Sequence, residues 1–483
     1  MRLRAPLPMG SIFASQSTMF STLLFSGIAL AQAPAAAPTP GATAPPTSAP
    51  PAATPEMAQG STAAPVTTPA APAVPPPPAV ATAPEATAAS PAPAVAASAT
   101  APAADAPPPP PPPWYNNLKI GAFADAYYSV NFNNPHPTSG TNAAVLVPGG
   151  NGGRAYDFNN GFSLHWAGVD AVYTSGNVGA TVGLRFGPST VGYNFFDNGN
   201  GAQFIKQAYA TWKPLGADGK LTLDLGKYDQ PYGSEVADSQ LNINYTRTFL
   251  YWLGQPLHFT GLRLDYAPAD QFDLKLFVAN GWNHVAANNS GVGHIAQNFG
   301  AQIMLKPIPE TMFMLGYLVG ANQDDTTPGV PATATTPAVP AAYDSDAKTR
   351  LRHFVDFVAD INPLPVLRIL GNVDYGTEKM PAGNPQAKWY GANLVVSVKP
   401  SDEFFIAPRG EIYVEDHWIN FFGQKVTLTD ATITAGYMPN PNFVLKLDLR
   451  ADHANQPVFP SSSIDTSKKS QYTGTLGVVA TTN

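Results

Sequence analysis

The sequence predicts an all-β protein: a transmembrane antiparallel β-barrel of about 16 strands, preceded by a disordered segment rich in proline and alanine. Three observations predict it. Apolar and polar residues alternate with period two, short and long connections succeed one another regularly, and the 483 residues include 12% charged and 11% aromatic residues with 41 glycines. Few charges beside many aromatics are unusual for a soluble protein, and they are expected of a barrel whose outer wall faces lipid.

The N-terminal part of the chain is predicted to lie outside the barrel. Two arginines precede an apolar run from Met19 to Leu30, which predicts a secretory signal peptide over residues 1–31. A membrane anchor is the alternative, although the run is shorter than the ~20 residues of a spanning helix. Residues 32–113 hold half of the 52 prolines and no aromatic or basic residue. This segment cannot build a core, so we expect a disordered periplasmic linker.

The linker has two interpretations. As an extended polyproline-rich chain it could span part of a bacterial envelope and contact peptidoglycan. The simpler alternative, which the composition slightly favours, is a low-complexity tail without a specific ligand. Residues 114–483 are the remaining part of the chain and form the predicted transmembrane pore domain.

Alternation runs along the whole of that domain. It is clearest from Phe443 to Asp452, where the apolar residues are Phe443, Leu445, Leu447 and Leu449 and the polar residues are Lys446, Asp448, Arg450 and Asp452. Such a strand has two chemically different faces. Because a sheet in lipid must leave no unpaired edge, we expect these strands to close into a barrel.

The connections support the same topology. Short polar turns, such as those at 175–177, 267–271 and 439–442, alternate with long segments at 132–160, 227–258, 321–350 and 453–470. Outer-membrane barrels are built in this way, with short turns at one end and long loops at the other. Counting strands between the connections gives 16, with both chain ends on the turn side. A soluble sandwich is the alternative, but it does not explain the separation of long from short loops.

If the apolar faces meet lipid, the polar faces line the interior, and a barrel of this size holds a water-filled channel. The candidate lumen-lining residues carry both signs of charge, and they are Asp125, Arg185, Asp224, Arg263, Asp265, Lys275, Asp356, Arg368, Arg409, Glu411 and Arg450. For any one of them, the alternative to a role in selectivity is an interior ion pair that holds strand register.

Residues 227–258 form the third connection on the long-loop side, counted along the chain, and they are the candidate constriction loop. In general porins the third loop folds inward and narrows the channel. Here residues 227–258 are rich in aromatics and include Asp229, Glu235, Asp238 and Arg247. We expect the aromatics to pack the loop against the wall while the acidic groups face the water and influence which ions pass. A surface-exposed loop is the alternative.

The same segment carries a family resemblance. Leu225-Gly226-Lys227-Tyr228-Asp229-Gln230-Pro231-Tyr232-Gly233 resembles the Gly-Lys-aromatic-x-x-Pro-aromatic-Gly signature of the OmpL-like β-barrel porins. Asn244-Tyr245-Thr246-Arg247, His258-Phe259-Thr260-Gly261-Leu262-Arg263 and Asn280-Gly281-Trp282 follow in the order of that family. The resemblance covers the chain from about Trp114 onward. It implies a pore-forming barrel in the outer membrane of a Gram-negative bacterium, and it supplies no substrate.

Other chemistry is not indicated. The absence of cysteine excludes disulfides and zinc–thiolate sites, and the net charge of −7 without a basic cluster gives no support for nucleic-acid binding. Adjacent ligands such as Glu415, Asp416 and His417 point to opposite faces of a strand, so no metal site is expected. No histidine has a catalytic partner at a defined spacing, so we expect neither an enzyme nor a cofactor.

We therefore predict an outer-membrane porin for passive diffusion of small hydrophilic solutes or ions, with membrane lipid around it and its N-terminal segment in the periplasm. Trimers are common among 16-strand porins, so a homotrimer is an expected assembly. One sequence does not reveal the interface. The alternative function is that of a structural envelope protein whose barrel anchors a wall-contacting, proline-rich segment.

Overall fold

The computed structural model describes residues 113–135, 151, 153–157, 160–194, 201–284, 298–323, 326–327, 342–343, 346–417, 424–462 and 467–482. The predicted signal peptide and nearly all of the predicted linker lie outside these residues, so those two assignments remain predictions. No helix in the described part of the chain is long and apolar enough to cross a membrane.

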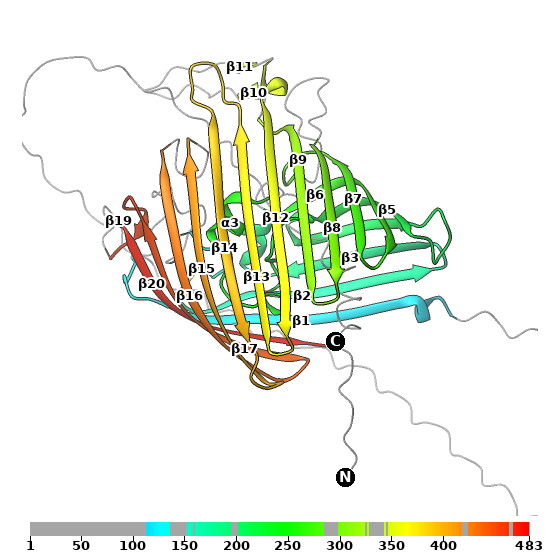
Figure 1. The fold of residues 1–483 in the computed structure, drawn as a ribbon, viewed down its shortest axis with the longest axis horizontal. Coiled ribbons are helices and arrows are strands. Elements are labelled where there is room, and N and C mark those ends of the chain that lie inside the picture. The colour runs from blue at the N-terminus through cyan, green and yellow to red at the C-terminus, as the bar shows by residue number, and fades with distance from the viewer. Residues whose placement is uncertain are drawn as a thin grey trace, which may run out of the picture. The chain divides into compact units, whose positions relative to one another are not determined.

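The described strands form a closed antiparallel barrel of 16 strands, in which each strand pairs with its neighbours in chain order (Figure 1). The predicted strand number and barrel closure are confirmed. The barrel strands are β1 (Leu118–Asn131), β2 (Gly161–Ser175), β3 (Val178–Phe186), β4 (Ile205–Trp212), β5 (Leu221–Asp229), β6 (His258–Ala269), β7 (Phe272–Ala279), β8 (Asn298–Ile308), β9 (Thr311–Ala321), β12 (Leu351–Leu364), β13 (Leu367–Glu378), β14 (Ala387–Val398), β15 (Phe404–Asp416), β16 (Val426–Asn440), β17 (Phe443–Ala454) and β20 (Ser470–Thr481).

The last strand closes the barrel. β20 pairs with β17 on one side and with β1 on the other, where Asp125 lies opposite Val479. Two small sheets lie outside the barrel ladder, and their strands are β10 (Thr326–Thr327) with β11 (Ala342–Tyr343), and β18 (Phe459–Pro460) with β19 (Ser467–Lys468). Closure satisfies the backbone amides that an open sheet edge would expose to lipid.

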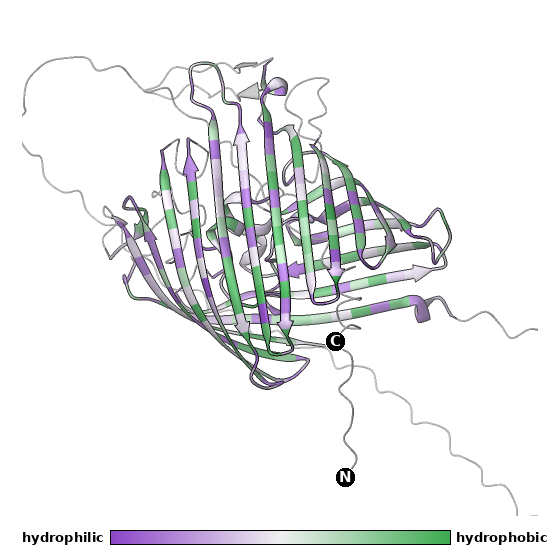
Figure 2. Ribbon diagram, viewed as in Figure 1, coloured by the Kyte–Doolittle hydropathy of each residue, from purple (hydrophilic) through white to green (hydrophobic). Residues whose placement is uncertain are grey.

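The two faces of the wall differ as the alternation predicts. In β17, Leu447 and Leu449 are exposed on the outer face, whereas Lys446, Asp448 and Arg450 are buried on the inner face. Figure 2 shows this alternation as green and purple bands along the strands. The apolar residues therefore form the outer surface and the charges point into the barrel.

The connections differ in length between the two ends of the barrel. Short turns join β2 to β3, β6 to β7 and β16 to β17, and we refer to their side as the turn end. Longer connections lie at the opposite, loop end. The third of them, residues 230–257 between β5 and β6, is called the inner loop below. It contains η3 (Ser239–Leu241) and α3 (Phe249–Gly254).

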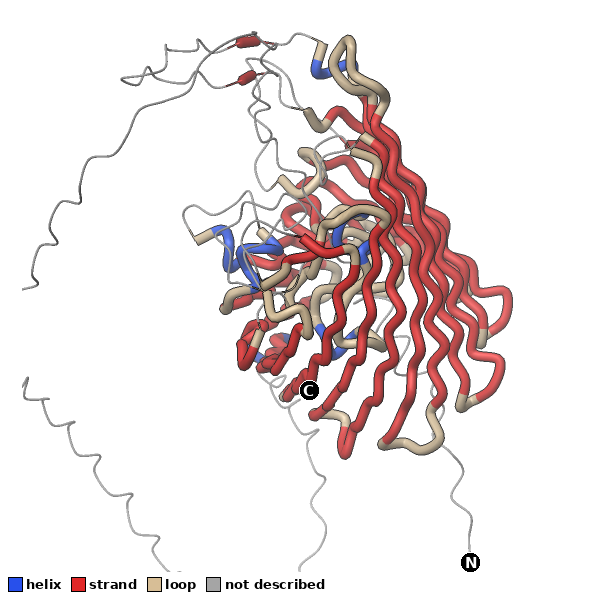
Figure 3. Tube along the Cα trace, turned by 90° about the vertical axis from the view of Figure 1, so that its left-hand side faces the viewer, coloured by secondary structure: helices blue, strands red, loops and turns tan. Residues whose placement is uncertain are grey.

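Short helices accompany the strands inside and at the ends of the wall. Figure 3 draws helices in blue, some among the loops between the red strands and one at the top end of the barrel. The short helices are η1 (Trp114–Asn117), α2 (Ser189–Tyr193), η2 (Ala202–Phe204), η3, α3 and η4 (Ala347–Thr349). α3 is capped by Thr248, whose Oγ1 accepts a 3.0 Å hydrogen bond from the Tyr251 backbone N–H.

Candidate functional site

The inner loop folds into the barrel and is bonded to its wall on several sides. The Gly233 N–H donates to Asp356 of β12 at 3.1 Å, and the Trp389 Nε1–H of β14 donates to the Gly254 carbonyl at 2.8 Å. On the other side of the lumen the Tyr245 hydroxyl donates to Asp125 of β1 at 2.8 Å. Figure 1 shows α3 behind β14. The loop therefore lies against the inner wall of the barrel. That it narrows a channel stays a prediction.

Glycines of the wall make room for aromatic rings of the loop. A Cβ atom added at Gly477 of β20 would lie 2.0 Å from the Tyr245 ring, and one at Gly316 of β9 would lie 2.4 Å from the Tyr232 ring. Neither ring could keep its position if the glycine carried a side chain. The aromatic rings of the loop therefore pack against the wall, as predicted, where the wall has glycines.

The predicted position of the acidic loop residues is wrong. Asp229 and Asp238 do not face water, because both are buried around Lys206 of β4, whose Nζ lies 2.9 Å from Asp229 Oδ2 and 2.7 Å from Asp238 Oδ2. Arg185 of β3 adds a second cation at 2.9 Å from Asp238. Burial alone would raise the pKa of Asp238, but Arg185 and Lys206 outweigh it and hold that pKa well below its ordinary value.

Glu235 is also buried rather than exposed to the channel. It lies 3.1 Å from Arg409 of β15, which contacts Asp430 of β16 at 2.7 Å as well. The Glu235 carboxylate further accepts hydrogen bonds from the backbone N–H and the hydroxyl of Thr248. Carboxylates in such an environment need paired cations, and the wall provides them. The acidic groups therefore fasten the loop to the wall.

Arg247 holds the loop together from within. Its guanidinium donates to the backbone carbonyls of Val236, Tyr245 and Ala237 and to the Ser239 hydroxyl, all within the inner loop. It also lies over the Tyr156 ring, 5.4 Å from the ring centre. Arg247 is thus a bracing residue of the loop in this structure.

All the candidate lumen-lining residues lie on inward-facing positions, but most are covered. Buried among them are Asp125, Arg185, Asp224, Arg263, Lys275, Asp356, Arg409, Glu411 and Arg450, whereas Asp265 and Arg368 are half-buried. Several form ion pairs across neighbouring strands: Arg263 with Asp224 at 2.6 Å, Lys275 with Asp265 at 2.8 Å, and Arg368 with Asp360 at 2.9 Å. Whether any of them acts on a solute stays a prediction.

Sequence reasoning missed part of the network. Arg154, in the connection between β1 and β2, lies 3.1 Å from both Asp157 and Asp452. Lys206 joins Asp229 at the end of β5 to Asp238 of the inner loop. Asp430 lies between Arg409 and Arg450. The inward-facing positions of Asp430 and Asp452 could have been found from the alternation of β16 and β17. Arg154 lies in a loop, where alternation gives no signal.

Below the inner loop, toward the turn end, the inner wall has two chemically different sides. On β2 to β6 the half-buried, inward-facing residues are polar, and they include Asp170, Gln207, Thr211, Thr222 and Asp265. On β9 to β16 the inward-facing residues form an apolar cluster of Val358, Leu370, Val395, Phe405 and Ala407, packed against Met314, Met438 and Ile243 of the inner loop. We call this second side the apolar wall.

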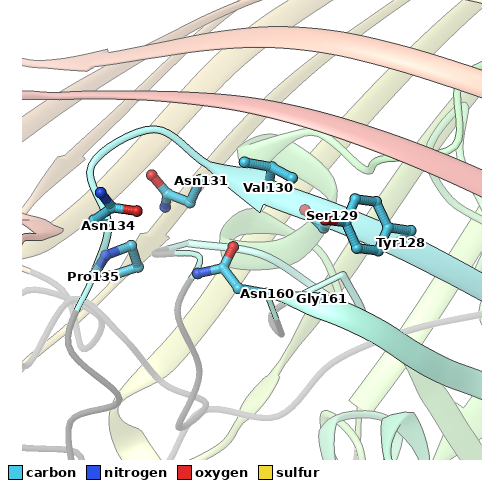
Figure 4. Close-up of a pocket in the computed structure, with 8 residues that line it drawn as sticks. All are labelled: Tyr128, Ser129, Val130, Asn131, Asn134, Pro135, Asn160 and Gly161. Carbon is cyan, nitrogen blue, oxygen red and sulfur yellow. The ribbon is translucent and has the colours of Figure 1, made fainter.

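One depression lies on the described part of the outer rim. Figure 4 shows a shallow depression at the loop end of β1 and the start of β2, lined by Tyr128, Ser129, Val130, Asn131, Asn134, Pro135, Asn160 and Gly161. None of these lining residues is charged. Among the residues that the structure describes, no cluster of histidine and acidic side chains is arranged to hold a metal ion.

The family comparison accounts for this architecture. Residues 117–481 match the model of the family described as "Putative beta-barrel porin-2, OmpL-like". The chain belongs to this family, as the motifs around the start of the inner loop indicated. It is therefore a porin-type barrel of the outer membrane.

Solved porin structures resemble the chain only distantly. OmpT of Vibrio cholerae gives a TM-score of 0.48 at 9% identity over 75% of this chain and 97% of that one. The outer membrane channel DcaP of Acinetobacter baumannii gives 0.47 at 12% over 75% and 96%, and an anion-selective porin from Comamonas acidovorans gives 0.46 at 10% over 75% and 99%. No curated protein is similar enough to count as a relative.

Proposed function

We propose that this porin allows small hydrophilic solutes or ions to diffuse passively across the outer membrane through the barrel interior, past the inner loop. The observation that carries the proposal is the charged inner face of a closed barrel, with both signs present on adjacent strands, as in the Arg263–Asp224 and Lys275–Asp265 pairs. A water-filled passage needs a polar lining, and such charged groups on the inner face provide one.

The inner loop is the proposed constriction. It is bonded to the wall by Glu235, Tyr245 and Trp389, so it narrows the interior as a fixed element. Solutes would be filtered by the width that it leaves and by half-buried groups such as Asp265 and Arg368. The acidic loop groups act indirectly in this proposal, because they position the loop and do not contact the solute.

The test is single-channel conductance of the purified, refolded protein in a planar bilayer with KCl on both sides. Discrete and reproducible current steps support the proposal. A barrel that is folded by circular dichroism and shows heat-modifiable migration, yet never conducts, would contradict it. The same recording in a salt gradient measures ion preference through the reversal potential.

The second candidate function is anchoring. The proline-rich residues 32–113 favour it, because a chain of this composition is long and extended enough to reach peptidoglycan. Deleting residues 32–113 separates the two functions. If channel activity persists and envelope integrity is lost, anchoring through the linker is the main role. A periplasmic linker, peptidoglycan contact and a homotrimer are proposals of the same standing, and cross-linking of cells can test the last two.

A further inference from the structure

The apolar wall is unusual for the inside of a porin-type barrel. Its members belong to neighbouring strands from β9 to β16, and their side chains occupy the same inward face as the charged residues nearer the loop end. In β12, for example, Asp356, Val358 and Asp360 share one face. The apolar residues therefore form a band across the wall, with charged residues on both its loop side and its turn side.

A row of methionines extends this wall to β8. Met304 of β8 lies directly opposite Met314 of β9, and Met314 lies opposite Val358 of β12. Met304, Met312 and Met314 are half-buried. Ile243, the inner-loop residue that packs against the cluster, is half-buried as well. Unlike the fully buried members, these side chains keep part of their apolar surface open to the interior.

Apolar surface left open inside a water-filled passage is costly, and such patches usually mark binding surfaces. The inner loop packs Ile243 against the cluster, and Asn244 Nδ2 donates to the Ala407 carbonyl at 3.2 Å. The polar side of the wall faces the cluster across the interior. Thioether side chains are flexible and adapt to differently shaped apolar groups. The apolar wall thus suits the hydrocarbon part of a solute.

A basic group lies at the edge of the apolar wall. Arg368 of β13 is two residues from Leu370 on the same inward face, and 27% of its side chain is exposed. Asp360 accepts hydrogen bonds from its Nε and Nη2 at 2.9 Å. Nη1 has no hydrogen-bond partner among the described residues and remains available to bind a carboxylate, the group that a guanidinium binds best.

The other charges near this edge carry both signs, and Lys399 lies 3.6 Å from Asp402. Lys306 and Lys399 are half-buried on the inward faces of β8 and of the end of β14. Asp360 is occupied by Arg368, and Asp402 is fully exposed on the turn beyond the barrel. Glu403 is exposed on that same turn. The apolar wall is therefore bordered by charges of both signs, because Asp273 of β7 lies opposite Met304 and the buried Asp356 is two residues from Val358. Arg368 Nη1 is the donor at this border that points to a carboxylate.

We infer that the solutes favoured by this porin are small amphiphilic carboxylates, with a short alkyl or aryl part on the apolar wall and the carboxylate at Arg368. The inference rests on the proposed function and specifies its substrate class. No covalent step is involved. The solute would move along the apolar wall between the inner loop and the turn end.

The test compares hexanoate, acetate and hexylammonium as blockers of single-channel KCl current through the full chain. Hexanoate is expected to reach half-block at a concentration about tenfold lower than acetate, which corresponds to burying roughly two methylene groups. It is also expected to block better than hexylammonium, because the head group must meet Arg368.

Variants assign the effect to the wall. Met304→Gln with Met314→Gln is expected to reduce the difference between hexanoate and acetate at least about threefold. The matched control, Thr222→Gln on the polar side of β5, should leave that difference unchanged. Arg368→Lys keeps the positive charge near Asp360 but removes the fork, so it should weaken block by hexanoate and by acetate to a similar extent and leave the difference between them unchanged.

The outcomes separate the two proposals. If no KCl steps are seen, the proposed function fails. If the pore conducts but acetate and hexanoate block equally, the proposed function stands and the apolar site is overturned. Equal block by hexylammonium and hexanoate would overturn the role of Arg368. A double methionine variant that folds, conducts and still prefers hexanoate as the native chain does would overturn the role of the methionines.

Discussion

Asp356 of β12 and Asp374 of β13 lie directly opposite each other, and both are at most 1% exposed. Asn372 Nδ2 donates to both carboxylates, at 2.8 and 2.9 Å, and the other donors are the Gly233 N–H and Gln255 Nε2. None of these groups is basic. The nearest basic groups on the same strands already have acidic partners: Arg352 pairs with Glu378, and Arg368 pairs with Asp360.

This pair leads to a stability prediction. Two buried carboxylates without a cation repel each other when both are charged. Asp374→Asn should therefore keep or increase the free energy of unfolding, by up to about 1 kcal/mol. Asp430→Asn should decrease it by about 3 kcal/mol, because Arg409 and Arg450 lose a buried partner. Thermal unfolding of the two variants in detergent, followed by circular dichroism, compares them. Equal losses would show that the Asp356–Asp374 pair is not strained by repulsion.

The close approach of Gly477 to Tyr245 leads to a second prediction. A valine at 477 would displace the ring that donates to Asp125, so Gly477→Val should destabilise the barrel by about 2 kcal/mol and raise open-channel noise. Gly410→Val is the control, because a Cβ at Gly410 meets nothing within 4 Å. Melting temperatures and current traces of both variants provide the check. If Gly410→Val were equally harmful, the effect would belong to barrel glycines in general.

The ion pairs of Asp238 make the stability of the folded protein depend on pH. Because Arg185 and Lys206 lower its pKa in the folded protein, its contribution to stability is complete above the unfolded pKa of about 4. That contribution is lost only as the pH falls through the lower, folded pKa. Asp238→Asn should thus reduce the melting temperature clearly at pH 7 and much less at pH 2. A difference between the variant and the native chain that stays constant over this range would argue against the ion pairs.

Much of the fold could be predicted because the signal is local. In β17 the alternation from Phe443 to Asp452 places every side chain on its observed face without any knowledge of neighbouring strands. The strand number followed from connection length, which is also local. The inward fold of residues 230–257 was expected from their place as the third long connection and from their aromatics.

The environment of the site could not be predicted in the same way. Glu235 meets Arg409, 174 residues away, and Asp238 meets Lys206 across two strand connections. Alternation shows that Arg409 points inward, but it does not show which loop group arrives there. The Asp356–Asp374 pair depends on the register of β12 against β13, where a shift of one residue would separate the carboxylates.

Glu411 provides the sharpest test that the inner loop is the constriction. Its carboxylate accepts the backbone N–H groups of Phe249 at 2.8 Å and Leu250 at 2.5 Å, and so holds the first turn of α3 against β15. Glu411→Ala leaves both donors unpaired, at a cost of about 2 kcal/mol, and should loosen this part of the loop. Single-channel recordings should then show larger and noisier steps. Glu411→Gln keeps an acceptor, so its step size and noise should lie between those of Glu411→Ala and of the native chain. Glu403→Ala on an exposed turn should leave the steps unchanged. Quiet steps of native size from a folded Glu411→Ala barrel would mean that the loop does not set the conductance.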